Sequence, residues 1–164
     1  MLCLPVCLML LACGEEKVER PQASFMGTFE AAMQACHDAD LDRLWPLLTL
    51  RAQEGVTRTL RDWQKRFRDP EEGPYLRGLI EERVGTLSDE AFDRAAAGTI
   101  QDAFRLMIRA DPRPAKPTQT GIEISKDGAT VKLRYVIPSD GQARTVVATL
   151  VRRDSGWYLD EFWL

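Results

Sequence analysis

Apolar residues recur every three or four positions through residues 24–110, which is the spacing of amphipathic helices. In the first such segment Phe25, Phe29 and Met33 fall on one face of a helix. Ser24 stands directly before this face, at a position where a side chain can cap a helix. The pattern therefore predicts that the chain between residues 24 and 110 is mainly helical.

Further apolar stripes predict further helices, which are separated by turn-forming segments. The stripes are Leu41, Leu44, Trp45, Leu47 and Leu48; Val56, Leu60, Trp63 and Phe67; Tyr75, Leu76, Leu79, Ile80 and Val84; and Ile100, Phe104, Met107 and Ile108. Asp40 is placed to cap the first of these helices, and Ser88, which is followed by Asp89 and Glu90, is placed to start a further helix. Pro46 predicts a bend, and residues 69–74 (DPEEGP) predict a turn or loop.

The period changes from 3.6 to 2 after the proline-rich segment DPRPAKP. Val131, Leu133, Tyr135 and Ile137 fall on one face of a strand. The segments KDG, PSDG and RDSG separate four such runs and suit hairpin turns. Residues 119–164 are therefore expected to form an antiparallel meander.

Helices followed by strands define an α+β fold. We expect N-terminal helices to pack on one face of a curved C-terminal antiparallel sheet of about four strands. One domain would span residues 24–164, with residues 24–110 mainly helical and residues 119–164 forming the sheet. No internal repeat of 20–50 residues is visible, which argues against a solenoid.

Residues 1–12 form an apolar run without charge. A helix of this length would span roughly 18 Å, less than the ~30 Å hydrocarbon core of a bilayer, and the run matches the h-region of a signal peptide. The sequence LLAC at residues 10–13 resembles the lipobox of bacterial lipoprotein signal peptides. That resemblance implies cleavage before Cys13, a lipid on its thiol, and a tether over residues 13–23. Ordinary secretion and a buried core segment are the alternatives.

Charge and cysteine content narrow the possible functions. The net charge is −3, and the basic residues form no cluster, so a nucleic acid is not an expected partner. Removal of the signal and lipidation of Cys13 would leave Cys36, which cannot form an internal disulfide and is expected to be buried. His37 is the single histidine and does not make a zinc site by itself. No cofactor motif occurs, and we expect no cofactor and no metal.

Two segments, FEAAMQACHDADLDRLWPLL and SGWYLDEFWL, resemble the nuclear-transport-factor-2-like (SnoaL-like, cystatin-like) cone fold, and in particular its small bacterial lipoproteins. The resemblance covers residues 24–164 and implies a curved sheet and helices that enclose a cone with an open mouth. Some members are isomerases, dehydratases or epoxide hydrolases that use Asp, His or Tyr in an apolar pocket, and others only bind. The helical pattern of residues 69–116 departs from the small hairpin and single helix of many members.

In such a cone the candidate pocket residues are Tyr135, Trp157, Asp160 and Glu161. Carboxylates and aromatic residues alternate on the last strand, so Asp160 and Glu161 are expected on opposite sides. One of them would lie near the cone interior. Alternatively, the carboxylates are cross-strand partners of arginines in the sheet, namely Arg134, Arg144 or Arg152.

The expected function is that of a lipid-anchored, non-catalytic module of the bacterial cell envelope. It would bind the membrane through its lipid and hold either a protein partner or a small apolar ligand. Gly14, in place of an inner-membrane retention aspartate, favours the outer membrane facing the periplasm where the cell has one. One alternative is a cone-fold enzyme that uses Asp160 or Glu161 with Tyr135. Another is an envelope assembly protein that docks through residues 51–110.

Overall fold

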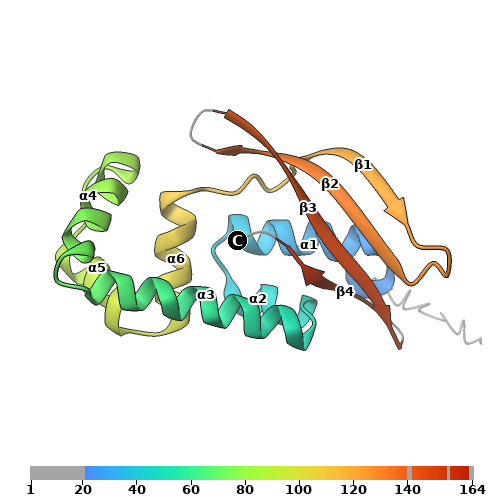
Figure 1. Cartoon of the computed structure of the whole chain (residues 1–164), viewed down its shortest axis with the longest axis horizontal. Helices are drawn as coiled ribbons and strands as arrows, with labels where there is room; N and C mark the ends of the chain where they lie inside the picture. The colour runs from blue at the N-terminus through green and yellow to red at the C-terminus, as the bar shows by residue number, and fades with distance from the viewer. Residues whose placement is uncertain (1–20, 140–141, 155, 163–164) are drawn as a thin grey trace, which may run out of the picture.

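The computed structural model describes residues 21–139, 142–154 and 156–162. In it the helices precede the sheet, as the change of hydrophobic period from 3.6 to 2 predicts. That part of the chain forms six α-helices and a four-stranded antiparallel sheet, which confirms the α+β class (Figure 1). The helices are α1 (Phe25–His37), α2 (Leu41–Leu44), α3 (Leu50–Arg68), α4 (Glu72–Val84), α5 (Asp89–Ala97) and α6 (Ile100–Ala110). The strands are β1 (Thr118–Ile124), β2 (Thr130–Ser139), β3 (Gln142–Arg153) and β4 (Gly156–Glu161). The 3₁₀ turns are η1 (Pro21–Ala23) and η2 (Trp45–Leu47), and η2 contains the bend expected at Pro46.

Side-chain caps fix where the helices begin. Ser24, Asp40 and Ser88 each accept a hydrogen bond from a backbone N–H of the first helical turn, which confirms the predicted caps. Thr49 and Thr99 cap α3 and α6 in the same way. Each cap satisfies an N–H group that has no partner inside its helix.

The segment 69–74, for which the sequence predicts a turn or loop, contains a turn at residues 70–71 and also the start of α4. Residues 69–74 are not all irregular, because α4 begins at Glu72 and contains Pro74. A proline is tolerated in the first turn, where the missing N–H would have had no helical partner. Asp69 supports this start, since its Oδ1 accepts hydrogen bonds from the backbone N–H groups of Glu71 (2.9 Å) and Glu72 (2.8 Å).

Each strand pairs with its neighbour in the sequence, in the order β1-β2-β3-β4, which is the expected meander. The predicted inward residues of β2 are buried, namely Val131, Leu133, Tyr135 and Ile137. Lys132 and Arg134 are exposed on the opposite face. One face of the sheet therefore belongs to the core and the other is in contact with solvent.

Strand β1 is an edge strand that the helices cover incompletely. Ile122 and Ile124 pair with Leu133 and Val131, so they lie on the core side of the sheet. Their side chains are nevertheless 45% and 60% exposed. Helix α1 packs on the sheet near β4, at the opposite edge, and this placement leaves the core side of β1 open.

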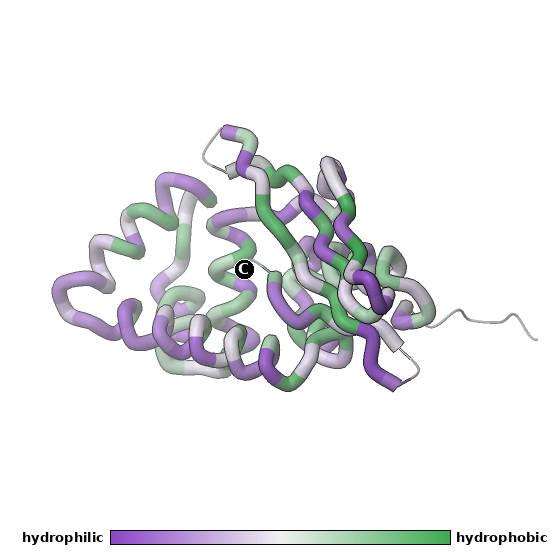
Figure 2. Tube along the Cα trace, turned by 45° about the vertical axis from the view of Figure 1, so that its right-hand side comes forward, coloured by the Kyte–Doolittle hydropathy of each residue, from purple (hydrophilic) through white to green (hydrophobic). Residues whose placement is uncertain are grey.

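The buried side chains form two hydrophobic clusters. The larger cluster joins the sheet to α1, α2, the first half of α3, and α6. The smaller cluster joins the second half of α3 to α4, α5 and α6. Hydrophobic and hydrophilic segments alternate along the elements in Figure 2, as expected when each element has one buried face. In the described residues we find no helix with the length and apolar character needed to cross a bilayer.

Candidate functional site

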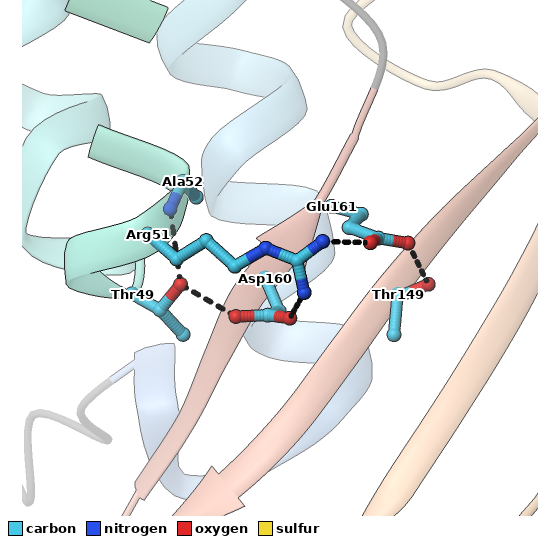
Figure 3. Close-up of polar contacts among 6 residues, drawn as sticks. All are labelled: Thr49, Arg51, Ala52, Thr149, Asp160 and Glu161. Atoms are coloured by element: carbon cyan, nitrogen blue, oxygen red, sulfur yellow. Dashed lines mark hydrogen bonds and ion pairs between the residues drawn. The ribbon is translucent and has the colours of Figure 1, made fainter. Parts of the chain in front are cut away.

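Two of the four candidate pocket residues meet at an arginine of α3. Asp160 Oδ2 lies 3.4 Å from Arg51 Nη1, and Glu161 Oε1 lies 2.7 Å from Arg51 Nη2 (Figure 3). Thr49 Oγ1 donates to Asp160 Oδ1 at 2.7 Å, and Thr149 Oγ1 donates to Glu161 Oε2 at 3.5 Å. These five residues, which we term the polar clasp, join the end of β4 to the start of α3. Arg51, Asp160 and Glu161 also line an open surface hollow of about 430 Å³.

Backbone pairing explains why the polar clasp forms. The N–H of Thr49 donates to the carbonyl of Leu159 at 2.8 Å, and Leu48 forms a parallel bridge with Leu159. Strand β4 also contains a β-bulge at Asp160. Leu159 and Glu161 pair with the consecutive residues Leu150 and Thr149 of β3, so Asp160 has no partner residue on β3. Such a bulge re-aims a side chain, and here it turns the carboxylate of Asp160 toward the N-terminus of α3. Negative charge is favourable at that end of a helix.

The salt bridges found for the two carboxylates are with Arg51 rather than with an arginine of the sheet. One of the two interpretations of the sequence gives the carboxylates a strand arginine as partner, namely Arg134, Arg144 or Arg152. Arg134 instead forms a salt bridge with Glu123 of β1. Register within a sheet identifies cross-strand neighbours, but it carries no information about a helix that packs against the end of the last strand.

Tyr135 lies far from the polar clasp. It pairs with Val146 on β3, whereas Leu159 pairs with Leu150, four residues further along that strand. Four strand residues correspond to about 13 Å. Tyr135 and Asp160 therefore do not converge on one site.

Tyr135 is instead buried in the larger hydrophobic cluster, and Trp157 is half-buried and packs against that cluster. The ring of Tyr135 packs edge-on against Phe29 with 5.0 Å between centroids, and Trp157 packs edge-on against Phe25 at 5.7 Å. Burial raises the pKa of the Tyr135 phenol to about 12, so the phenol is neutral and a poor proton donor near pH 7. Of the four candidates, the structure brings together Asp160 and Glu161 and places the other two elsewhere.

The buried side chain of Arg113, from the segment after α6, lies near the exposed His37 at the end of α1. His37 Nδ1 is 2.8 Å from the backbone carbonyl oxygen of Arg113, and the Arg113 side chain forms a salt bridge with Asp111 at 3.0 Å. Burial raises the pKa of the Cys36 thiol to about 12, with nearby Arg113 partly offsetting the effect. Cys36 is buried, as the sequence predicts, and its thiol is not an activated nucleophile. Among the described residues, His, Cys, Asp and Glu form no group able to hold a metal ion.

An apolar cavity of about 260 Å³ lies among α3, α4 and α6. Its walls include Trp63 and Phe67 from α3, Leu79 and Arg83 from α4, and Phe104 and Met107 from α6. Asp111 and Arg113, from the segment after α6, complete the polar part of the lining. Sequence reasoning missed this cavity. The apolar stripes identify the residues that face inward, but they do not show that three facing helices leave space between them.

The predicted lipidation site, Cys13, lies outside the described residues. Comparison of the chain with protein-family models, with curated proteins and with solved structures finds no match. The function must therefore be inferred from the geometry of the chain itself.

Proposed function

We propose that the chain is a lipid-anchored, non-catalytic module of the bacterial cell envelope that binds a small apolar ligand among α3, α4 and α6. The observation that carries this proposal is the cavity of about 260 Å³ with its aromatic and aliphatic walls. Ligand sites are typically concave and mostly apolar, with a few polar groups that orient the ligand. An apolar cavity of about 150 Å³ is enough for benzene. The cavity among α3, α4 and α6, at about 260 Å³, has room for a phenyl ring with a short chain.

The open hollow beside the polar clasp supports ligand binding less well. It is larger, at about 430 Å³, but Arg51, Asp160 and Glu161 in its wall already bind one another. A ligand that used these groups would have to replace existing salt bridges and hydrogen bonds. The cavity among the helices requires no such exchange, because most of its wall is apolar.

The placement of the candidate acid–base residues supports a non-catalytic role. A general base must lie within hydrogen-bond reach of the proton that it removes, and a partner acid must reach the same substrate. Tyr135 and Asp160 are separated along the sheet, and Asp160 is held by Thr49 and Arg51. The resemblance of the sequence to nuclear-transport-factor-2-like proteins fits this role, since that superfamily includes members that only bind.

The proposed membrane attachment rests on the N-terminal sequence. The LLAC segment would direct a lipid to Cys13, and the ten residues 14–23 can extend over at most ~33–36 Å. The domain would then stay close to the membrane, on the periplasmic side of the outer membrane in a cell that has one.

Ligand binding can be tested with a neutral probe, 4-phenylbutanamide, by equilibrium dialysis against the full chain in lipid nanodiscs. We expect saturable binding by the unmodified protein and its loss in Leu79→Trp, which places a larger side chain in the cavity wall. Tyr75→Trp is the matched control, because Tyr75 lies one turn away on α4 and is 66% exposed. Equal binding by both variants, or no binding above that of empty nanodiscs, would overturn the proposed site.

The anchor can be tested separately with Cys13→Ser. We expect the unmodified protein to fractionate with membranes and to carry a lipid on the peptide that begins at Cys13, as measured by mass spectrometry. The variant should lose the lipid and leave the membrane fraction while it keeps its circular dichroism spectrum. A wild-type protein that is unlipidated and soluble would contradict the anchor and leave the ligand site untouched.

A further inference from the structure

The outer side of α3 carries an excess of positive charge. The helix contains six basic and two acidic residues, and all of these residues are exposed. Other residues separate most of them along the sequence, but the helical repeat brings them to the side that faces away from the core. Helix α3 therefore has a charge of +4 near pH 7, although the whole chain has a charge of −3. The basic residues are Arg51, Arg58, Arg61, Lys65, Arg66 and Arg68, and the acidic residues are Glu54 and Asp62.

The neighbouring helices α4 and α5 have the opposite charge. Together they contain six acidic and three basic residues, which is a charge of −3. Figure 1 shows α3 along the lower edge of the molecule, with its start near β4 and its end near α4 and α5. A negatively charged surface would therefore attract the outer side of α3 and repel the part formed by α4 and α5.

The basic residues in the middle of α3 line an open surface hollow of about 550 Å³. Arg58, Arg61 and Lys65 follow one another at spacings of three and four residues, which places them side by side on the helix surface. Glu54 and Asp62 also line the hollow, and Asp62 is paired with Lys65 at 3.2 Å. Within the described part of the chain, neither Arg58 nor Arg61 takes part in a salt bridge. Their guanidinium groups are therefore available to an anion outside the protein.

Apolar side chains line the same hollow at the start of α3. Leu50 is 67% exposed there, and Trp45, from the turn before α3, is half-buried. Tryptophan and leucine beside basic residues are typical of protein surfaces that bind at the boundary between lipid headgroups and acyl chains. The outer side of α3 thus combines the charged and the apolar groups that bind a membrane surface.

The proposed anchor would bring this side of α3 within reach of the membrane. The described chain begins at η1, which packs against the start of β4, and α3 begins beside the end of β4. The intervening length of β4 is ~10 Å, and the helix from Leu50 to Arg61 adds ~16 Å. The eight residues from Cys13 to Arg20 can extend over about 26–29 Å. A lipid at Cys13 and the middle of α3 can therefore reach one membrane surface.

We infer that the outer side of α3 docks on anionic phospholipid headgroups of the membrane that holds the anchor. Arg58, Arg61 and Lys65 contact the headgroups. Leu50 and Trp45 enter the boundary with the acyl chains. This inference rests on the proposed membrane attachment and adds a second point of contact, which would hold the domain in one orientation with α4 and α5 directed away from the lipid.

The test uses the full chain with Cys13→Ser, which removes the lipid so that the contribution of α3 can be measured. Cosedimentation gives its partition coefficient on vesicles of equimolar phosphatidylglycerol and phosphatidylcholine, and on vesicles of phosphatidylcholine alone. The ratio of the two coefficients is the quantity of interest, because the same N-terminal residues are present on both surfaces. One basic residue at an anionic membrane strengthens binding about fivefold, so we expect a ratio of at least about thirtyfold.

Variants assign this preference to α3. Arg58→Gln combined with Arg61→Gln should lower the ratio by at least about tenfold. The matched control is Arg105→Gln combined with Arg109→Gln, which changes the net charge equally at exposed sites that line a different hollow, beside α5. The control should keep the ratio within about twofold. Leu50→Ala should weaken binding to the anionic vesicles by about threefold, because it removes apolar surface from the contact.

The outcomes separate this inference from the proposed anchor. A ratio near one for the Cys13→Ser chain would overturn the docking surface, whether or not the unmodified protein carries a lipid on Cys13. Equal losses in the α3 and α6 variants would also overturn it, since total charge rather than the outer side of α3 would then attract the protein. The expected ratio, with its loss confined to the α3 variants, would support the docking surface even in a protein whose Cys13 is found unlipidated.

Discussion

Thr49 joins two elements through a single hydroxyl group. Its Oγ1 accepts a hydrogen bond from the backbone N–H of Ala52 at 3.2 Å and donates to Asp160 at 2.7 Å. The residue is 3% exposed, so water does not readily replace either contact. Arg51 binds the same carboxylate, but its side chain is 69% exposed, and solvent screens that salt bridge.

We therefore expect Thr49→Ala to lower the free energy of unfolding by about 1–2 kcal/mol through loss of the cap and of the Asp160 contact. Arg51→Gln should cost less than about 1 kcal/mol. Urea unfolding measures both, and Thr49→Ser, which keeps the hydroxyl group, is the control. A larger loss for Arg51→Gln than for Thr49→Ala would show that the ion pairs dominate the polar clasp.

The buried phenol of Tyr135 makes stability depend on alkaline pH. The pKa of a solvent-exposed tyrosine is 10.0, and burial raises the pKa of Tyr135 to about 12 in the folded chain. Between these values the unfolded chain loses a proton that the folded chain keeps, so the contribution of Tyr135 to stability falls as pH rises from 10 to 12 and is present in full below pH 10.

When the pH rises from 9 to 11, the free energy of unfolding should fall by about 1 kcal/mol less in Tyr135→Phe than in the unmodified protein. Cys36, whose pKa is also raised, adds a dependence of the same sign in both proteins, so the difference is assigned to Tyr135. Urea unfolding at the two pH values measures the effect, and Tyr75→Phe, at a 66% exposed site, is the control. Parallel pH profiles for Tyr135→Phe and the unmodified protein would count against a buried phenol.

At the scale of elements, two glycines of α4 have opposite environments. A Cβ added to Gly73 would lie 2.4 Å from the backbone carbonyl oxygen of Phe67, whereas a Cβ added to Gly78 would meet nothing within 4 Å. Gly73 therefore permits a close approach of the backbone at the turn between α3 and α4.

We expect Gly73→Ala to destabilise the protein by about 1–3 kcal/mol, because backbone atoms must move to admit the methyl group. Gly78→Ala should stabilise it by up to about 1 kcal/mol, since alanine is the better helix former. Both values come from urea unfolding, and the two variants add the same atoms to the same helix. Equal effects at the two positions would mean that α3 and α4 do not approach as closely as the structure shows.

The sequence predicts features that depend on short-range interactions, and it misses features that depend on contacts between distant elements. The stripe containing Phe25, Phe29 and Met33, and the alternation in β2, depend on neighbours within one element, and their helix and strand are confirmed. Arg51 was not predictable as the partner of Asp160, because 109 residues separate them along the chain. The cavity depends on how three helices face one another, and no pattern within a single helix contains that information.

At the scale of the whole molecule, α3 and α6 belong to both hydrophobic clusters. In α3, Leu60 is part of the larger cluster and Phe67 of the smaller one. Leu60 and Phe67 lie on the same continuous helix, so loss of packing around one end of α3 removes support from the other. The sheet and the helices around the cavity should therefore unfold together, as a single domain over residues 24–164 would.

Phe92 offers a direct test of this coupling. Its ring packs against Phe67 with 5.3 Å between centroids, and it lies in the smaller cluster, away from the sheet. We expect Phe92→Ala to lower the free energy of unfolding by about 3–5 kcal/mol. Because α3 is shared, hydrogen exchange at the amides of Leu133 and Leu150 should accelerate in proportion to the loss in global stability.

The control is Leu50→Ala, at a 67% exposed site of α3, which should change neither measurement by more than about 0.5 kcal/mol. Unchanged exchange in the sheet of Phe92→Ala, together with a separate early transition of the helices, would show two independently folding units instead of one.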